Sequence, residues 1–239
     1  MTVAAATFLA LNQPGEVSSL GETVASEQQS GFLQSFLFIF ISEIGDKTFF
    51  IAGLLAAKYG RLVSFAGSIG ALAVMTVIST SLGQIFHAVP ESLTNGVRYG
   101  DYVAVAAFSY FGLKTLYDTS HLKDNHNSGI EDEKEEAEKS VAKLSADEKL
   151  KSTMLTIFQI FSLVFSAEIG DRSFLSTIAL SAALNPFAVA SGGIAAHGLA
   201  TGVAVICGII LSKYLSEKAI GYISGFLFIT FAITTGLGQ

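Results

Sequence analysis

Residues 31–57 read GFLQSFLFIFISEIGDKTFFIAGLLAA, an apolar segment with charged residues at its centre. The segment exceeds the roughly 20 residues that a helix needs to cross a bilayer. A charge at that depth costs several kcal/mol unless it is compensated. Glu43, Asp46 and Lys47 should therefore face a polar cavity rather than lipid, and their position predicts a functional site.

The whole chain has the composition of a membrane protein. Of its 239 residues 51% are hydrophobic and only 14% are charged, against about 25% charged in a typical soluble domain. The apolar runs do not alternate as the strands of a barrel do. We expect an all-α polytopic membrane protein with six transmembrane helices, near 32–57, 64–88, 99–118, 154–182, 187–211 and 219–237.

Composition also limits the partners. The formal net charge of −6 argues against nucleic acid, and the lipid bilayer is the expected surroundings of the apolar segments. A single cysteine, Cys207, excludes an intramolecular disulfide and a cysteine-based metal cluster, and packing is its simplest role. No nucleophile and base accompany the central carboxylates, so an enzyme is not expected.

The chain contains an internal repeat. A shift of 125 residues lays residues 43–46 (EIGD) on residues 168–171 (EIGD), and it also aligns Gly67 with Gly192. An odd number of spans in each half would place the halves in opposite orientations. Two inverted three-helix repeats are a recurring plan of secondary transporters, with the substrate site near the membrane midplane between them.

The repeat divides the chain into four parts. Residues 1–30 are a polar N-terminal extension, either disordered or a targeting segment, and residues 31–119 form the first repeat. Residues 120–153 are a charged linker, and residues 154–239 form the second repeat.

The linker is expected to be solvated, with a polar helix around 130–150. Its simplest role is that of a spacer, and the alternative is a cation-gathering or regulatory loop that uses His121 and His126. Most basic residues outside the two motifs lie in the linker and in the two loops on its side, whereas only Arg98 lies in the opposite loops. The positive-inside rule then places the linker in the cytoplasm or stroma and both termini on the other side.

The two motifs are EIGDKT at 43–48 and EIGDRS at 168–173. On a continuous helix the glutamate and aspartate of each motif, at i and i+3, share a face. The inverted repeat would gather four carboxylates, and the glycine between each pair would allow close helix approach or expose a backbone carbonyl. Such hard oxygen ligands suit Ca²⁺, Mn²⁺ or Mg²⁺ rather than copper or zinc.

The charges of the motifs predict exchange. Four carboxylates with Lys47 and Arg172 leave a net charge of −2, which one divalent cation or two protons would neutralise. Burial and mutual repulsion favour protonation, so protons and metal would compete for one site. The alternative is a structural ion pair such as Glu43 with Lys47 at i and i+4. Two copies at matching depth argue against that alternative.

Four further residues are weaker candidates. His197, which aligns with Leu72 in the repeat, is either a nitrogen ligand, a proton carrier or a residue that bonds a neighbouring helix. Met75 is either a soft ligand that selects Mn²⁺ or a packing residue. Gln34 and Gln159 precede each motif glutamate by nine residues and would line an access path.

The doubled motif resembles the GDT family of cation exchangers, over about residues 32–237 without the central linker. The runs DKTFFIAGLLAAK and DRSFLSTIAL are most similar to its chloroplast and cyanobacterial branch. Many members have Gln where this chain has Phe49 and Phe174. The resemblance implies cation ligands and supporting motif residues. The ligands are Glu43, Asp46, Glu168 and Asp171, and the supporting residues are Gly45, Lys47, Thr48, Gly170, Arg172 and Ser173.

We therefore expect a secondary transporter that exports Mn²⁺, with Ca²⁺ as a further substrate, from the cytoplasm in exchange for H⁺. No prosthetic group is implied. A Ca²⁺/H⁺ antiporter, a passive divalent-cation channel and a metal-sensing membrane protein are the alternatives. The resemblance implies a thylakoid or plasma membrane of a cyanobacterium-like cell, or a plastid membrane.

Overall fold

The structure, a computed structural model, describes residues 14–87, 99–121, 128–146, 152–211 and 216–237, and every regular element in these ranges is a helix. Helix α6 (Ser128–Ala146) lies in the linker. The first half contains α2 (Pro14–Glu43), α3 (Lys47–Tyr59), α4 (Arg61–His87) and α5 (Tyr99–His121). The second half contains α7 (Thr153–Glu168), α8 (Arg172–Ala183), α9 (Pro186–Leu211) and α10 (Glu217–Gly236).

Several helices have the length and composition of membrane spans. Within the described residues, three helical segments are long and apolar enough to cross a membrane on their own: Arg61–Ile85, Pro186–Cys207 and Lys218–Gly236. Helices α7 and α8 are long and apolar enough only when they are taken together, as a pair that is bent by 72°. Helix α5 covers the expected span 99–118 but carries three charged residues, Asp101, Lys114 and Asp118. The helical content and these apolar helices support the expected all-α membrane protein.

The expectation of an unbroken helix through each motif is wrong. Helix α2 ends at Glu43 and α3 begins at Lys47, while α7 ends at Glu168 and α8 begins at Arg172. Gly45 and Gly170 adopt φ angles of 86° and 82°, in the left-handed region that glycine enters without steric penalty. A Cβ on Gly170 would meet no atom within 4 Å, so this glycine serves the turn rather than close helix approach.

The N-terminal helix starts earlier than the apolar segment. Helix α2 begins at Pro14, inside the stretch expected to be a polar extension, so residues 14–30 are helical. Residues 1–13 lie outside the described part. A targeting role for this extension stays a prediction.

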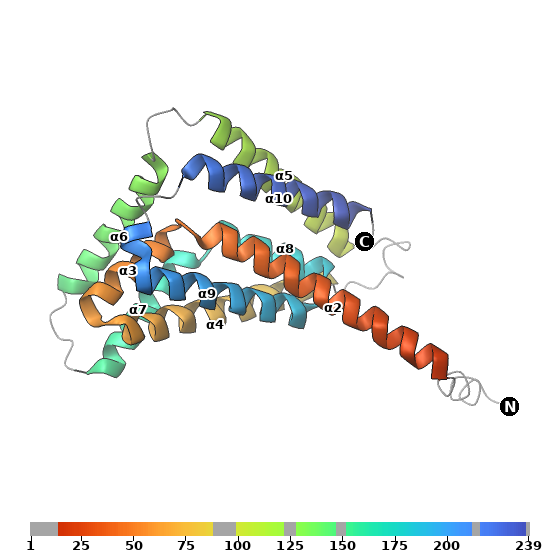
Figure 1. Ribbon diagram of the computed structural model, residues 1–239, viewed down its shortest axis with the longest axis horizontal. Helices are drawn as coiled ribbons and strands as arrows, with labels where there is room; N and C mark the ends of the chain where they lie inside the picture. The colour runs from red at the N-terminus through yellow and green to blue at the C-terminus, as the bar shows by residue number, and fades with distance from the viewer. Residues whose placement is uncertain (1–13, 88–98, 122–127, 147–151, 212–215, 238–239) are drawn as a thin grey trace.

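Equivalent helices of the two halves make equivalent contacts (Figure 1). Helix α9 packs on α2 and α3, as α4 packs on α7 and α8, and α5 pairs with α10. A Cβ on Gly67 of α4 would lie 2.9 Å from Ile157 O, and one on Gly192 of α9 would overlap Phe32 O. Gly192 lies 125 residues after Gly67, and Ile157 lies 125 residues after Phe32, so the two contacts are equivalent. The repeat in the sequence is therefore also a repeat in helix packing.

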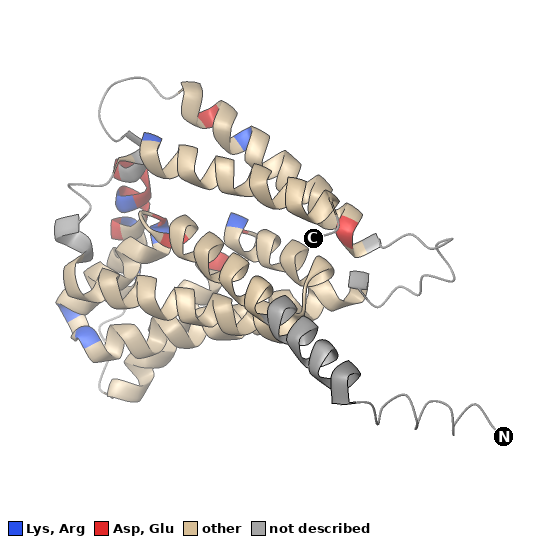
Figure 2. Ribbon diagram, turned by 45° about the vertical axis from the view of Figure 1, so that its right-hand side comes forward, with Lys and Arg blue, Asp and Glu red and all other residues tan. Residues whose placement is uncertain are grey.

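Helix α6 confirms the expected helix in the linker but is not simply solvated. Its Ala137 and Val141 are buried in one cluster with Phe49 and Phe50 of α3. The other side of α6 is charged, and Figure 2 shows charged residues gathered at this end of the molecule, while the long helices are mostly uncharged. The linker helix is therefore an amphipathic element docked on the first half.

Candidate cation site

The two motifs form the same local structure at two helix breaks. The backbone N–H of Asp46 donates to Glu43 O at 3.2 Å, and that of Asp171 donates to Glu168 O at 3.1 Å. Each aspartate is then the N-cap of the following helix: Asp46 Oδ2 accepts from Thr48 N, and Asp171 Oδ2 from Ser173 N, both at 3.4 Å. Each aspartate thus starts a new helix instead of sharing a helix face with its glutamate.

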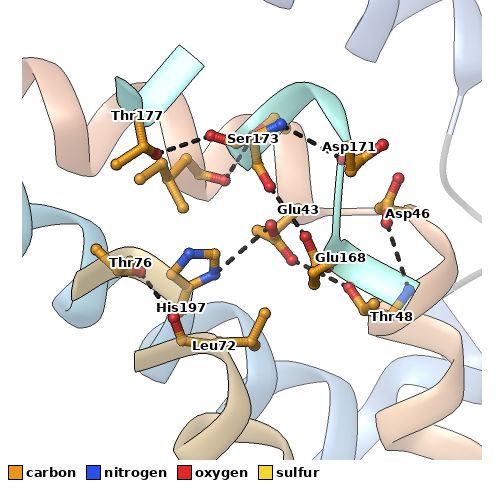
Figure 3. A network of polar contacts seen from close by, with 12 residues as sticks. Glu43, Asp46, Thr48, Leu72, Thr76, Glu168, Asp171, Ser173, Thr177 and His197 are labelled. Atoms are coloured by element: carbon orange, nitrogen blue, oxygen red, sulfur yellow. Dashed lines mark hydrogen bonds and ion pairs between the residues drawn. The ribbon is translucent and has the colours of Figure 1, made fainter. Parts of the chain in front are cut away.

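The two glutamates lie at the centre of the site (Figure 3). Glu43 and Glu168 are only 4% and 2% exposed, and their carboxylates are close enough to interact electrostatically. Thr48 Oγ1 donates to Glu43 Oε2 at 3.3 Å, and Ser173 Oγ donates to Glu168 Oε2 at 3.1 Å. One hydroxyl donor does not balance a buried carboxylate, so each glutamate needs a cation or a proton as well.

The basic residues of the motifs lie toward the linker. Lys47 Nζ pairs with Glu136 Oε2 of α6 at 3.2 Å, and no pair between Lys47 and Glu43 is present among the described residues. This contact removes the simple alternative in which Glu43 and Lys47 serve only to pair with each other. Exposed Arg172 lines a cavity of about 190 Å³ together with Asp46.

The larger cavity also contains acidic residues that sequence reasoning missed. Asp118 of α5 and Glu133 of α6 line it with Asp46. The signal for Glu133 was present in the linker, where Ala137, Val141 and Leu144 recur at helical spacing and predict a docked apolar face. Nothing in the hydropathy of α5 marks Asp118 as a lining residue.

The weaker candidates fall into two groups. His197 and Met75, 4% and 5% exposed, line a second, small cavity beside Glu168, and His197 Nδ1 lies 3.5 Å from Glu43 Oε1. Gln34 and Gln159 line neither of these two cavities. Gln34 Nε2 donates to Ser30 Oγ at 2.9 Å, so a role in an access path stays a prediction.

The four motif carboxylates do not form one ready-made metal centre. Within the described ranges, no group of three or more His, Cys, Asp or Glu side chains lies close enough together to hold a metal ion. The glutamates occupy the centre and the aspartates cap the helices around it. The set of four carboxylate ligands therefore stays a prediction.

Discontinuous helices at the interface of two repeats are a feature of secondary transporters. The family model described as divalent cation/proton antiporter GDT1 matches residues 31–123 and 156–239. The chain belongs to this family, a family of transporters rather than enzymes. The match omits most of the linker.

Named relatives confirm the expected branch. The chain is 46% identical over 219 residues to a chloroplastic GDT1-like protein 2 of Oryza sativa, covering 90% of this chain and 63% of the relative. It is 45% identical over 227 residues to the chloroplastic protein PAM71 of Arabidopsis thaliana, covering 92% and 59%. A GDT1-like protein of Synechocystis is 39% identical over 209 residues, covering 86% and 96%.

This chain thus spans about three fifths of the length of the plant relatives and nearly all of the cyanobacterial one. With the apolar helices, these relatives support an integral membrane protein of a thylakoid or plastid membrane. No solved structure matches the chain.

Proposed function

We propose that this protein exports Mn²⁺ from the cytoplasm or stroma in exchange for H⁺. The observation that carries the proposal is the pair of helix breaks at which Glu43 and Glu168 are both buried. Family membership supports coupling of a divalent cation to protons. The resemblance to the branch that moves manganese favours Mn²⁺ as the cargo.

The architecture that fits this activity has six spans in two inverted halves. Helices α2 and α3 would form one broken span, followed by α4 and α5, and the second half would repeat this order from α7 to α10. Figure 1 supports the orientation, since the α3–α4 turn, helix α6 and the start of α10 lie at one end of the molecule. These segments carry Lys58, Arg61, the α6 lysines and Lys218, and basic residues favour the cytoplasmic or stromal side.

The charge of the site explains why exchange is favoured over a pore. Buried carboxylates are stable only with a compensating cation, which is either Mn²⁺ or protons. A site that is never empty and opens to one side at a time moves the two ions in opposite directions. A channel would need a continuous pore, and the two halves packed around the glutamates fit a carrier better.

The test uses purified protein in liposomes that contain one reporter for Mn²⁺ and one for pH. We expect Mn²⁺ movement coupled to opposite proton movement in the wild type. Glu43→Gln and Glu168→Gln should abolish both fluxes because each removes a buried charge of the site. Glu135→Gln, which changes an exposed carboxylate of α6, is the control and should transport normally.

Other outcomes separate the alternatives. Mn²⁺ flux without proton counterflux would indicate a channel, and binding without flux would indicate a sensor. A repeat with Ca²⁺ ranks the two cations and shows whether a Ca²⁺/H⁺ antiporter is the better description. Coupled transport that survives both glutamate substitutions would overturn the site.

A further inference from the structure

A small buried cavity lies between helices α4, α8 and α9, beside the motif of the second half. Its volume is about 10 Å³, close to the roughly 10–15 Å³ that a single water molecule needs. It therefore has room for one dehydrated ion. Its polar lining consists of Thr76, Ser79, Glu168, Ser173, Thr177 and His197.

Two of these side chains lack the partners that buried polar atoms normally have. Among the described residues, Glu168 Oε1 and His197 Nδ1 are both buried and make no hydrogen bond. The 3.5 Å separation of His197 Nδ1 from Glu43 Oε1 is an ion-pair distance that would need a protonated ring. Leaving such atoms unpaired costs about 1–3 kcal/mol each, and two of them lining one ion-sized cavity indicates a missing ligand.

The hydroxyl groups around the cavity are arranged to accept a cation. Ser173 Oγ gives its proton to Glu168 Oε2, Thr177 Oγ1 to Ser173 O, and Thr76 Oγ1 to Leu72 O. Because each proton points at another acceptor, the oxygen lone pairs remain for a ligand. A cation binds such lone pairs directly.

The polar lining of this cavity is only partly repeated around the other glutamate, Glu43. In the repeat, the residue equivalent to His197 is Leu72. The residues equivalent to Ser79 and Thr177 are Ala204 and Ala52. The surroundings of Glu43 at these positions are thus apolar. The two glutamates are therefore unequal, although their motifs match.

We propose that this cavity is the occluded cation position, that Glu168 Oε1 and His197 Nδ1 are its ligands, and that His197 selects Mn²⁺ over Ca²⁺. The inference rests on the proposed function and specifies its site. Ca²⁺ takes six to eight oxygen ligands in a roomy, flexible shell. A cavity for one ion with an imidazole nitrogen in its lining suits a transition-metal ion better than Ca²⁺.

The test is pulsed electron paramagnetic resonance on the purified full chain loaded with one equivalent of Mn²⁺, with any polyhistidine tag removed. We expect the bound Mn²⁺ to show hyperfine coupling to a directly bound histidine nitrogen. His197→Gln should remove this coupling and weaken Mn²⁺ binding by about tenfold. Ca²⁺ binding should change little, so the preference for Mn²⁺ over Ca²⁺ should fall by a similar factor.

The spectrum of the wild type decides the question even if His197→Gln fails to fold. Coupled Mn²⁺/H⁺ transport with no nitrogen coupling would overturn this inference and leave the proposed function standing. An unchanged cation preference in a folded His197→Gln protein would also overturn it. Absence of both Mn²⁺ binding and transport would overturn the proposed function itself.

Discussion

At the scale of single residues, two glycines determine the geometry of the site. Gly45 and Gly170 hold left-handed backbone angles that let the chain turn between the glutamate and the aspartate. A residue with a side chain pays about 1–2 kcal/mol in that region. A third glycine, Gly60, has a φ of 93° between α3 and α4, and a Cβ there would also meet no atom within 4 Å.

Gly60 therefore provides a matched control for Gly170. We expect Gly170→Ala to lower the free energy of unfolding by about 1–2 kcal/mol and Gly60→Ala by about 1–3 kcal/mol, measured by denaturation in detergent. Only Gly170→Ala should also reduce Mn²⁺ transport severalfold, because the strain falls on the turn that positions Glu168 and Asp171. Equal transport by the two variants would mean that the turn does not need this conformation for function.

The sequence predicts the burial of the glutamates better than the turn beside them. A charge inside an apolar segment has to be compensated, and that argument holds for Glu43 and Glu168 whatever the local backbone. The spacing of glutamate and aspartate at i and i+3 fits a continuous helix and does not predict the break. The N-cap signal was nevertheless visible, since Asp46 and Asp171 each precede a Thr or Ser by two residues and a new apolar run begins there.

At the scale of elements, helix α6 joins the linker to the site. Its apolar face packs on α3, its Glu136 pairs with Lys47, and its Glu133 lines the cavity that contains Asp46. Composition alone favours a solvated spacer, because it averages the two faces of an amphipathic helix. The docking of α6 follows from periodicity and not from composition.

The docking predicts a contrast between two alanines of α6. Ala137 is fully buried, whereas Ala142 is exposed. Ala137→Asp should release α6 from α3, because a carboxylate cannot be buried among apolar side chains, and Ala142→Asp should not. Hydrogen exchange over residues 128–146 measures the difference. Equal protection in the two variants would contradict the packing of α6.

The docking of α6 should also depend on pH through Glu133. Burial raises the pKa of the Glu133 carboxyl, and neighbouring Glu136 raises it further, while Lys47 and Arg172 oppose the shift. A raised pKa means that the docked state favours the protonated form. The contribution to docking is thus complete below the ordinary value of 4.5 and is lost as the pH rises through the raised pKa.

Glu133→Gln tests this pH dependence because glutamine resembles the protonated carboxyl. We expect the wild type to lose protection of residues 128–146 as the pH rises above the ordinary value of 4.5 and through the raised pKa of Glu133, and Glu133→Gln to lose less. The comparison is made at matched pH, so that titration of other groups is common to both proteins. Identical pH profiles would show that Glu133 does not control docking.

At the scale of the whole molecule, the sequence predicts the repeat but not which helices pair. In lipid the apolar faces of all helices are equally well solvated. Hydropathy therefore identifies α4, α9 and α10 as spans but does not predict which helices they pack against. Small residues decide the contacts, as at Gly67 and Gly192, where neighbouring backbones approach too closely for a side chain. The matching glycines of the two halves can be read from the sequence. The residues that these glycines contact can be read only from the packed structure.

The proposed inverted arrangement predicts which side of the membrane each segment faces. Three spans lie between the linker and the C-terminus in the proposed architecture, so α6 and the end of α10 must face opposite sides. Exposed Glu135 and Leu237 can each be changed to cysteine in a Cys207→Ser background, which removes the single native thiol. A maleimide that does not cross membranes then reports which side each position faces.

In sealed cells that carry the protein in their plasma membrane, we expect Leu237→Cys to react directly and Glu135→Cys to react only after permeabilisation. The physical reason is that the basic residues of α6 and of the neighbouring turns resist transfer across the membrane. Inverted vesicles should give the opposite result, which controls for simple differences in reactivity between the two positions. Labelling of both positions from the same side would require an even number of spans in the second half, and the halves could not then be inverted.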